Sequence, residues 1–179
     1  CCTTNGDVLV VYSGNRKGHV CPYGRVEMVR SSDDGETWSE PAVIAKTPLD
    51  DRDAGIVQLP DGRLLVTFFN SLAFMEKCYR TGGYRYDIQE AEYAEWDRIY
   101  ERAGGVRAKA VCGNYAVWSS DGGRTWTTAA AGSVKNPAGR FFFGRLRSGN
   151  ILLVKNGPVD TQTDRRDLMA FLSEDDGKT

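Results

Sequence analysis

The fold is decided by a stretch that occurs three times: SSDDGETW at residues 31–38, SSDGGRTW at 119–126 and SEDDGKT at 173–179. Each copy reads Ser-x-Asp-x-Gly-x-Thr, and Trp follows in the first two copies. In such a segment the Asp carboxylate can accept from backbone N–H groups two residues further on, Gly adopts a positive φ, and Thr-Trp resumes a strand. Each copy is therefore interpreted as a hairpin turn, and three copies predict a repeat architecture.

A second repeated signal lies upstream of each copy: TNGDVLV at 4–10, PDGRLLV at 60–66 and RSGNILL at 147–153. Each is a tight turn followed by an apolar strand. One unit thus reads strand, tight turn, strand, variable connection, strand, Ser-x-Asp turn and strand, which is the four-stranded meander of a propeller blade. The predicted strands cover 7–13, 26–32 and 42–46 in the first unit, 55–59, 63–70, 111–120 and 126–130 in the second, and 140–147, 150–156 and 167–173 in the third.

The second unit carries a long insertion, residues 71–110. Residues 87–102 contain no Gly or Pro and are followed by Gly104 and Gly105, which predicts a helix with a C-terminal Gly stop. Its apolar residues form a loosely helical stripe: Ile88, Ala91, Tyr93, Trp96, Ile99 and Tyr100. We expect this helix to pack on the rest of the fold; a helix that binds a partner protein is the alternative.

The Ser-x-Asp-x-Gly-x-Thr-Trp pattern resembles the Asp-box, or BNR, repeat of the sialidase superfamily. The resemblance implies an all-β fold, a six-bladed β-propeller, of which about three blades lie in this chain. Blade one would span 1–47, blade two 48–131 with the helical insertion 71–110, and blade three 132–179, incomplete; together they form one partial propeller domain. Because the chain starts without Met and ends inside the third box, we expect it to be part of a longer protein.

Composition disfavours several function classes. The net charge is −1, from 23 basic and 24 acidic residues, which gives no field for nucleic acid or an anionic membrane. Apolar runs such as 8–12 and 151–154 have the length of strands, not of membrane helices. The five cysteines form no Cys-x-x-Cys pair, which favours free buried thiols, although the compartment stays open between cytoplasmic and secreted. No metal-ligand spacing or phosphate loop occurs, so no metal or cofactor is predicted.

Strand order predicts the functional face. In an antiparallel meander the tight turns and the Asp-boxes share one end, and the variable loops share the other. These loops are expected at 14–24, 47–54, 71–110, 132–140 and 157–166. The run Asp50-Asp51-Arg52-Asp53 leads directly into the apolar strand 55–59, so the site is expected at this end, opposite the boxes.

The resemblance suggests individual site residues. Asp53 lies where sialidases carry a pocket Asp, and Asp51 is a candidate second carboxylate, since glycoside hydrolysis commonly uses two. The sialidase general acid is an Asp in the first blade, but residues 8–32 contain none; His19, the only His, stands near that place. His19 is therefore either a proton-transfer group or a structural residue. The predicted substrate-binding residues are Arg16, Arg52 and Arg140.

The resulting hypothesis is a sialidase-like glycoside hydrolase that acts on a terminal sugar of a glycan, with acidic sugars among the candidates. The missing Asp favours a divergent branch with another sugar specificity. One alternative is a non-catalytic carbohydrate-binding or assembly propeller; another is a scaffold that binds protein through residues 71–110. The expected ligand is a glycan or small sugar, and no catalytic nucleophile is assigned because sialidases carry theirs in later blades.

Overall fold

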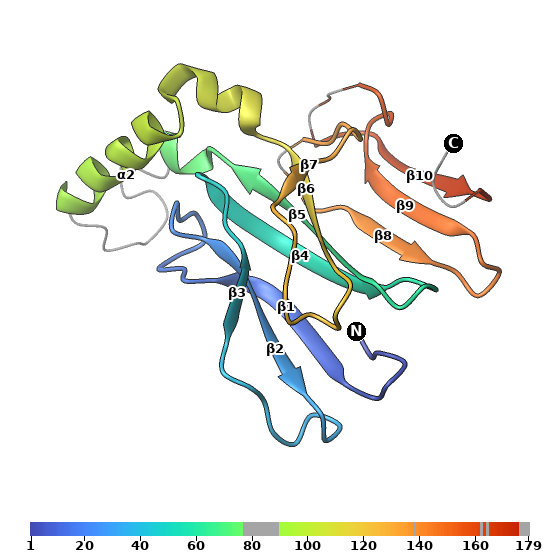
Figure 1. The fold of residues 1–179 in the computed structure, drawn as a ribbon. Helices are drawn as coiled ribbons and strands as arrows, with labels where there is room; N and C mark the ends of the chain where they lie inside the picture. The colour runs from blue at the N-terminus through green and yellow to red at the C-terminus, as the bar shows by residue number, and fades with distance from the viewer. Residues whose placement is uncertain (77–89, 138, 162, 164, 176–179) are drawn as a thin grey trace. The chain divides into compact units, whose positions relative to one another are not determined.

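The computed structural model describes residues 1–76, 90–137, 139–161, 163 and 165–175. The fold is mostly β, with strands arranged in three antiparallel sheets (Figure 1). The chain divides into two compact units, Cys1–Ala131 and Gly132–Thr179, and each is described by itself. The described strands form no closed barrel, and the number of blades stays a prediction.

The first sheet of unit one has the order β1-β2-β3. Strand β1 spans Val8–Gly14, β2 spans Arg25–Ser31 and β3 spans Ala42–Ala45. Val8 pairs with Ser31, and Gly14 pairs with Arg25. The turn at Gly6, where φ is +92°, therefore leads into the same end of the sheet as the first Asp-box.

The second sheet has the order β4-β5-β6-β7. Its strands are β4 Asp50–Gln58, β5 Leu64–Ser71, β6 Asn114–Ser119 and the two-residue β7 Ala130–Ala131. Asp50 pairs with Ser71, so the charged run is the start of a strand. The predicted loop 47–54 is thus too long, because β5 extends far enough to pair with the charged residues.

The described part of the insertion between β5 and β6 contains the predicted helix. It contains the short 3-10 helices η1 (Ala73–Met75) and η2 (Gly105–Val111) and the α-helix α2 (Glu90–Arg102). Trp96 is 2% exposed and lies edge-on to the rings of Phe74 and Tyr93, with centroids at 6.1 and 5.6 Å. Four described members of the stripe therefore pack on other segments of unit one: Tyr93, Trp96, Ile99 and Tyr100. The predicted helix residues 87–89 lie outside the described residues.

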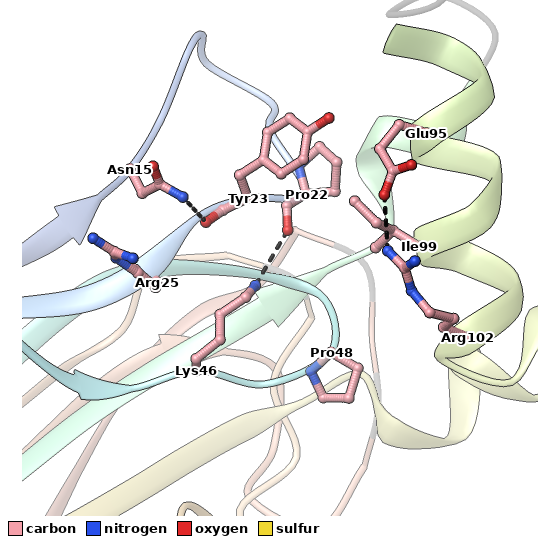
Figure 2. Close-up of a pocket in the computed structure, with 9 residues that line it drawn as sticks. All are labelled: Asn15, Pro22, Tyr23, Arg25, Lys46, Pro48, Glu95, Ile99 and Arg102. Atoms are coloured by element: carbon pink, nitrogen blue, oxygen red, sulfur yellow. Dashed lines mark hydrogen bonds and ion pairs between the residues drawn. The ribbon is translucent and has the colours of Figure 1, made fainter. Parts of the chain in front are cut away.

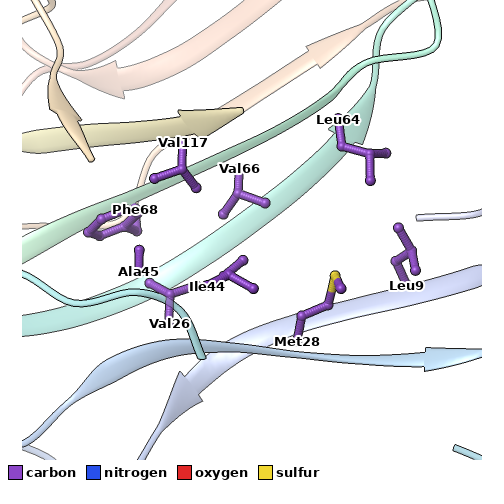
Figure 3. Packing of buried hydrophobic residues seen from close by; sticks show 9 residues of the cluster. All are labelled: Leu9, Val26, Met28, Ile44, Ala45, Leu64, Val66, Phe68 and Val117. Atoms are coloured by element: carbon purple, nitrogen blue, oxygen red, sulfur yellow. The ribbon is translucent and has the colours of Figure 1, made fainter. Parts of the chain in front are cut away.

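The core of unit one lies between its two sheets (Figure 3). Buried apolar side chains of both sheets meet there, and on β2 and β5 the residues of this cluster occupy alternating positions, which share one face of a strand. The ring of Phe68 also stacks on Tyr115, with centroids 5.7 Å apart. The core residues are Leu9, Val26, Met28, Ile44 and Ala45 from the first sheet and Leu64, Val66, Phe68 and Val117 from the second.

The third sheet belongs to unit two and has the order β10-β9-β8. Strand β8 spans Phe142–Arg145, β9 spans Ile151–Asn156 and β10 spans Leu168–Ser173. Lys155 is fully buried here, and its ammonium donates to the carbonyls of Asn156, Gly157 and Pro158 at 2.5–2.7 Å. These bonds satisfy three loop carbonyls with one charged side chain.

The Asp-boxes are turns held by their own side chains. In the first, Asp33 accepts from the backbone N–H of Thr37 at 2.9 Å, and Ser31 Oγ accepts from the N–H of Gly35 at 2.8 Å. The second box repeats these bonds through Asp121 and Ser119. The Asp thus reaches four residues along the chain, not two as expected. These bonds hold the pKa of the Asp33 carboxyl down, at about 2.

Candidate functional site

The end of unit one opposite the Asp-boxes brings together three connections. The β1–β2 loop follows Gly14, the β3–β4 loop precedes Asp50, and the helical insertion follows Ser71. At the other end, the boxes follow β2 and β6, and the guanidinium of Arg30 donates to the carbonyl of Gly122 in the second box. The predicted candidates in unit one all lie at the first end.

Arg16 is bound to the protein itself. Its guanidinium holds the carboxylate of Asp50 with both terminal nitrogens, at 2.5 and 3.3 Å, and also donates to the carbonyl of His19. Asp50 is fully buried and accepts a third bond from the Cys21 N–H at 3.2 Å. Burial raises the pKa of the Asp50 carboxyl, and Arg16 opposes this shift. The pair fastens the β1–β2 loop to the start of β4.

Asp51 is also fully buried, on the opposite side of β4 from Asp50. Its carboxylate accepts from the N–H and the hydroxyl of Thr47, at 2.7 and 2.5 Å, and lies 3.9 Å from the Lys46 ammonium. Asn70 donates to the same Thr47 hydroxyl at 3.0 Å. Burial raises the pKa of Asp51 to about 6. The structure therefore places this predicted carboxylate beneath the surface.

Arg52 and His19 are brought together, although 33 residues separate them. A terminal nitrogen of Arg52 lies 3.4 Å from His19 Nε2, which can accept the bond in the tautomer protonated at Nδ1. The guanidinium also lies 5.9 Å from the Phe69 ring centroid, at the distance of a cation–π interaction. Arg52 is 9% exposed and His19 is exposed, so a ligand could reach the imidazole first.

Asp53 has a left-handed backbone, with φ +50°, inside strand β4. The register of β4 against β5 shifts between Arg52 and Gly55, and the Asp53 N–H donates to Ser13 Oγ at 2.9 Å. This conformation is uncommon for any residue except Gly, and such irregularities often re-aim a side chain at a functional site. Asp53 is half-buried, so it is more exposed to solvent than the fully buried Asp50 and Asp51.

Arg140 lies in unit two, exposed and two residues before β8. It belongs to a different unit from the other five predicted residues. Its role as a ligand-binding residue stays a prediction.

Sequence reasoning missed the residues that hold this group in place. Thr47 donates to the Asp51 carboxylate, and Asn70 donates to that Thr47 hydroxyl. Ser13 accepts from the backbone N–H of Asp53, and Lys46 donates to the carbonyls of Pro22, Gly24 and Leu49 at 2.6–3.2 Å. Nothing in their local sequence marks them, because each acts through a partner from another loop or strand. In the sequence, only the charged run at residues 50–53 indicated this group of residues.

The chemistry available at this end is that of hydrogen bonding and proton transfer. Arg52 offers a cationic donor, His19 an imidazole and Asp53 a carboxylate. Within the described residues, no group of three His, Cys, Asp or Glu side chains could hold a metal ion. Across the same ranges, every helix is too short or too polar to span a bilayer.

Comparisons with known proteins agree with the repeat pattern. Residues 102–179 match the family model of the BNR repeat-like domain. A search of curated proteins gives no match. Two solved structures share the fold: a protein of unknown function from Dyadobacter fermentans DSM 18053, at 21% identity and a TM-score of 0.55, and the Hadza microbial sialidase Hz136, at 16% identity and a TM-score of 0.55.

The chain is shorter than both structural neighbours. The alignment covers 98% of this chain and 50% of the Dyadobacter protein, and 99% of this chain and 34% of the sialidase. At these identities the likeness concerns the fold, and the repeat match and the Asp-boxes add the family. The match over residues 102–179, together with the shared fold, supports membership of the sialidase/BNR-repeat superfamily.

Proposed function

We propose that the full-length protein is a sialidase-like glycoside hydrolase that cleaves a terminal sugar from a glycan. Its site lies at the end of unit one opposite the Asp-boxes. Asp53 is the catalytic carboxylate, His19 transfers a proton, and Arg52 donates to hydroxyls or to a carboxylate of the sugar. Asp51 and Arg16 are assigned a positioning role, because both are committed to bonds within the protein.

The observation that carries this proposal is the left-handed Asp53 beside the Arg52–His19 contact. A non-Gly residue in this conformation costs about 1–2 kcal/mol unless the fold gains from it. Here the bulge leaves Asp53 half-buried, next in sequence to a cationic donor. Likeness to a named sialidase adds support, although the chain spans 34% of that protein, so the whole protein's activity is a proposal.

The test is turnover by the full-length protein of an aryl α-sialoside and of a panel of neutral and uronic aryl glycosides. We expect release from one sugar class and loss of at least about a hundredfold in kcat with Asp53→Asn. Asp34→Asn is the matched control, because Asp34 also has a left-handed backbone, φ +57°, but lies in the first Asp-box at the opposite end. Unchanged turnover with Asp53→Asn would remove Asp53 from the mechanism.

A second candidate is a carbohydrate-binding propeller without hydrolase activity. It is favoured by the burial of Asp50 and Asp51, which leaves Asp53 as the accessible carboxylate of the charged run, whereas glycoside hydrolysis commonly uses two. Glycan binding that persists in a protein silent across the whole panel would support this candidate over the hydrolase.

A further inference from the structure

A pocket of about 400 Å³ lies in unit one beside helix α2, and none of the predicted site residues lines it (Figure 2). Its volume falls within the usual range of small-molecule sites. One wall is the last turns of α2, with Ile99 and Arg102, and the other is the β1–β2 loop, with Pro22 and Tyr23. Pro48, from the β3–β4 loop, adds a further lining side chain.

The walls combine flat apolar surfaces with polar rims. Pro22, Tyr23, Pro48 and Ile99 offer rings and an aliphatic chain, which suit the apolar face of a pyranose ring. Asn15 donates its amide to the carbonyl of Tyr23 at 3.3 Å, which orients its side-chain oxygen. A sugar, which has apolar C–H faces and hydroxyl edges, matches this pattern better than a purely apolar ligand does.

The charge of the lining is positive. Arg25, Lys46 and Arg102 line the pocket, against one acidic side chain, Glu95. The Lys46 ammonium gives its hydrogens to three backbone carbonyls, so it contributes charge rather than a free donor. This balance favours an anionic ligand.

Arg25 is the group best prepared to bind that anion. Its Nε donates at 2.6 Å to Glu27, which is 6% exposed, so a buried carboxylate fixes the plane of the guanidinium. Its two terminal nitrogens have no hydrogen bond among the described residues and form a fork suited to a carboxylate. Arg102 is held differently, because one of its terminal nitrogens donates to Glu95 at 2.9 Å.

We infer that this pocket is an accessory subsite for an acidic glycan, whose ring lies on Tyr23 and whose carboxylate is bound by Arg25. The β1–β2 loop that supplies Tyr23 also supplies His19, so one glycan could be held at both places. The inference rests on the proposed function only in that both take a glycan as ligand; it does not require hydrolysis.

The test uses the full-length protein carrying Asp53→Asn, so that turnover does not consume the ligand. Calorimetry compares a uronic-acid tetrasaccharide with the same tetrasaccharide after reduction of its carboxylates to alcohols. We expect the acidic form to bind about tenfold more tightly. Tyr23→Ala should weaken both forms about tenfold, and Arg25→Lys should remove the preference for the acidic form while leaving the charge beside Glu27.

Arg107→Ala is the matched control, because Arg107 is exposed on η2 and does not line the pocket. Arg102→Gln, at an exposed position, replaces Tyr23→Ala in the test if that variant does not fold. It should weaken binding of the acidic form alone. Equal binding of both tetrasaccharides, or affinities unchanged by the pocket variants, would overturn the inference. A third outcome separates the two proposals: the pocket variants lose binding, and the protein with Asp53 intact hydrolyses no glycoside of the panel. This outcome would refute the proposed hydrolase and support the subsite.

Discussion

Arg16 holds Asp50 with two hydrogen bonds across 34 residues of sequence. The Asp50 side chain is fully buried, and that of Arg16 is 16% exposed. This pair joins the β1–β2 loop, which carries His19, to the strand that carries Arg52 and Asp53. It is therefore the contact that sets the spacing of the candidate site, although neither partner needs to touch a substrate.

Breaking this pair should destabilise the protein strongly. Arg16→Met leaves the Asp50 carboxylate buried without its counter-charge, so we expect a loss of about 3 kcal/mol in the free energy of unfolding. Combining Arg16→Met with Asp50→Asn should recover part of that loss, because position 50 then carries no unpaired buried charge. Guanidinium chloride denaturation of the single and double variants measures both effects.

The neighbouring ion pair is the control. Lys17 Nζ lies 2.6 Å from Glu92 on helix α2, but the Lys17 side chain is 69% exposed. Lys17→Met should therefore cost far less than Arg16→Met, because solvent screens the exposed charge. A cost for Arg16→Met as small as that for Lys17→Met would show that the Arg16–Asp50 pair is not a structural clamp.

The backbone at position 53 gives a second prediction. Because φ is +50° there, Asp53→Ala should be less stable than Asp53→Gly by about 1 kcal/mol. At the next residue the order should reverse, since Ala54 has no positive φ and Gly costs chain entropy. Thermal melts compare the Ala and Gly forms at each position: Gly should be the more stable at position 53 and Ala at position 54. If the same residue is the more stable at both positions, the left-handed conformation of Asp53 is contradicted.

Local sequence signals predicted much of the fold. Strands β1, β2, β5 and β9 lie within one residue of the ranges expected from the turn motifs, because turn chemistry and alternation act between near neighbours. The start of β4 was missed. Four consecutive charged residues are typical of a loop, and only their pairing with β5, together with Arg16 and Thr47, makes a buried strand of them.

The sequence predicted the end of unit one at which Arg52, His19 and Asp53 lie, but not how they are arranged there. The charged run and the strand order indicate the end opposite the Asp-boxes, and all three residues lie at that end; its role as the functional site stays a prediction. The sequence cannot show that Asp51 is buried on Thr47, or that Asp53 is left-handed, because both depend on tertiary partners. The pocket beside α2 was equally hidden, since its walls come from three separate segments.

Asp51 should make stability fall as pH rises. Burial raises its pKa from 3.8 to about 6, so between these values the folded state keeps a proton that the unfolded chain has lost. The stabilising contribution is present at low pH and is lost as pH rises through about 6, by about 3 kcal/mol. The facing groups are Lys46 and Thr47, which oppose the shift, and Asp50, which adds to it.

The measurement is urea denaturation at a series of pH values from 4 to 8. Asp51→Asn cannot titrate, so the stability of the natural protein should fall relative to this variant across that window. Thr47→Val removes a hydroxyl that donates to the carboxylate, so it should move the window to higher pH. Parallel curves for the natural protein and Asp51→Asn would show that Asp51 does not titrate with a raised pKa.

The first Asp-box should give the opposite pH dependence. Hydrogen bonds from Ser31 and Thr37 lower the pKa of Asp33 to about 2, so its contribution is present above about pH 4 and is lost as pH falls toward 2. Asp33→Asn should therefore lower the melting temperature at pH 7 and flatten its fall in acid. Asp34→Asn should leave both unchanged, because Asn tolerates the left-handed backbone of Asp34 equally well.

The second box has the same arrangement around Asp121, so combining Asp33→Asn with Asp121→Asn should flatten the fall of the melting temperature in acid further. If Asp33→Asn and Asp34→Asn behave alike, the Asp carboxylate is not what holds the turn, and the repeated Ser and Gly of the box would have to do so.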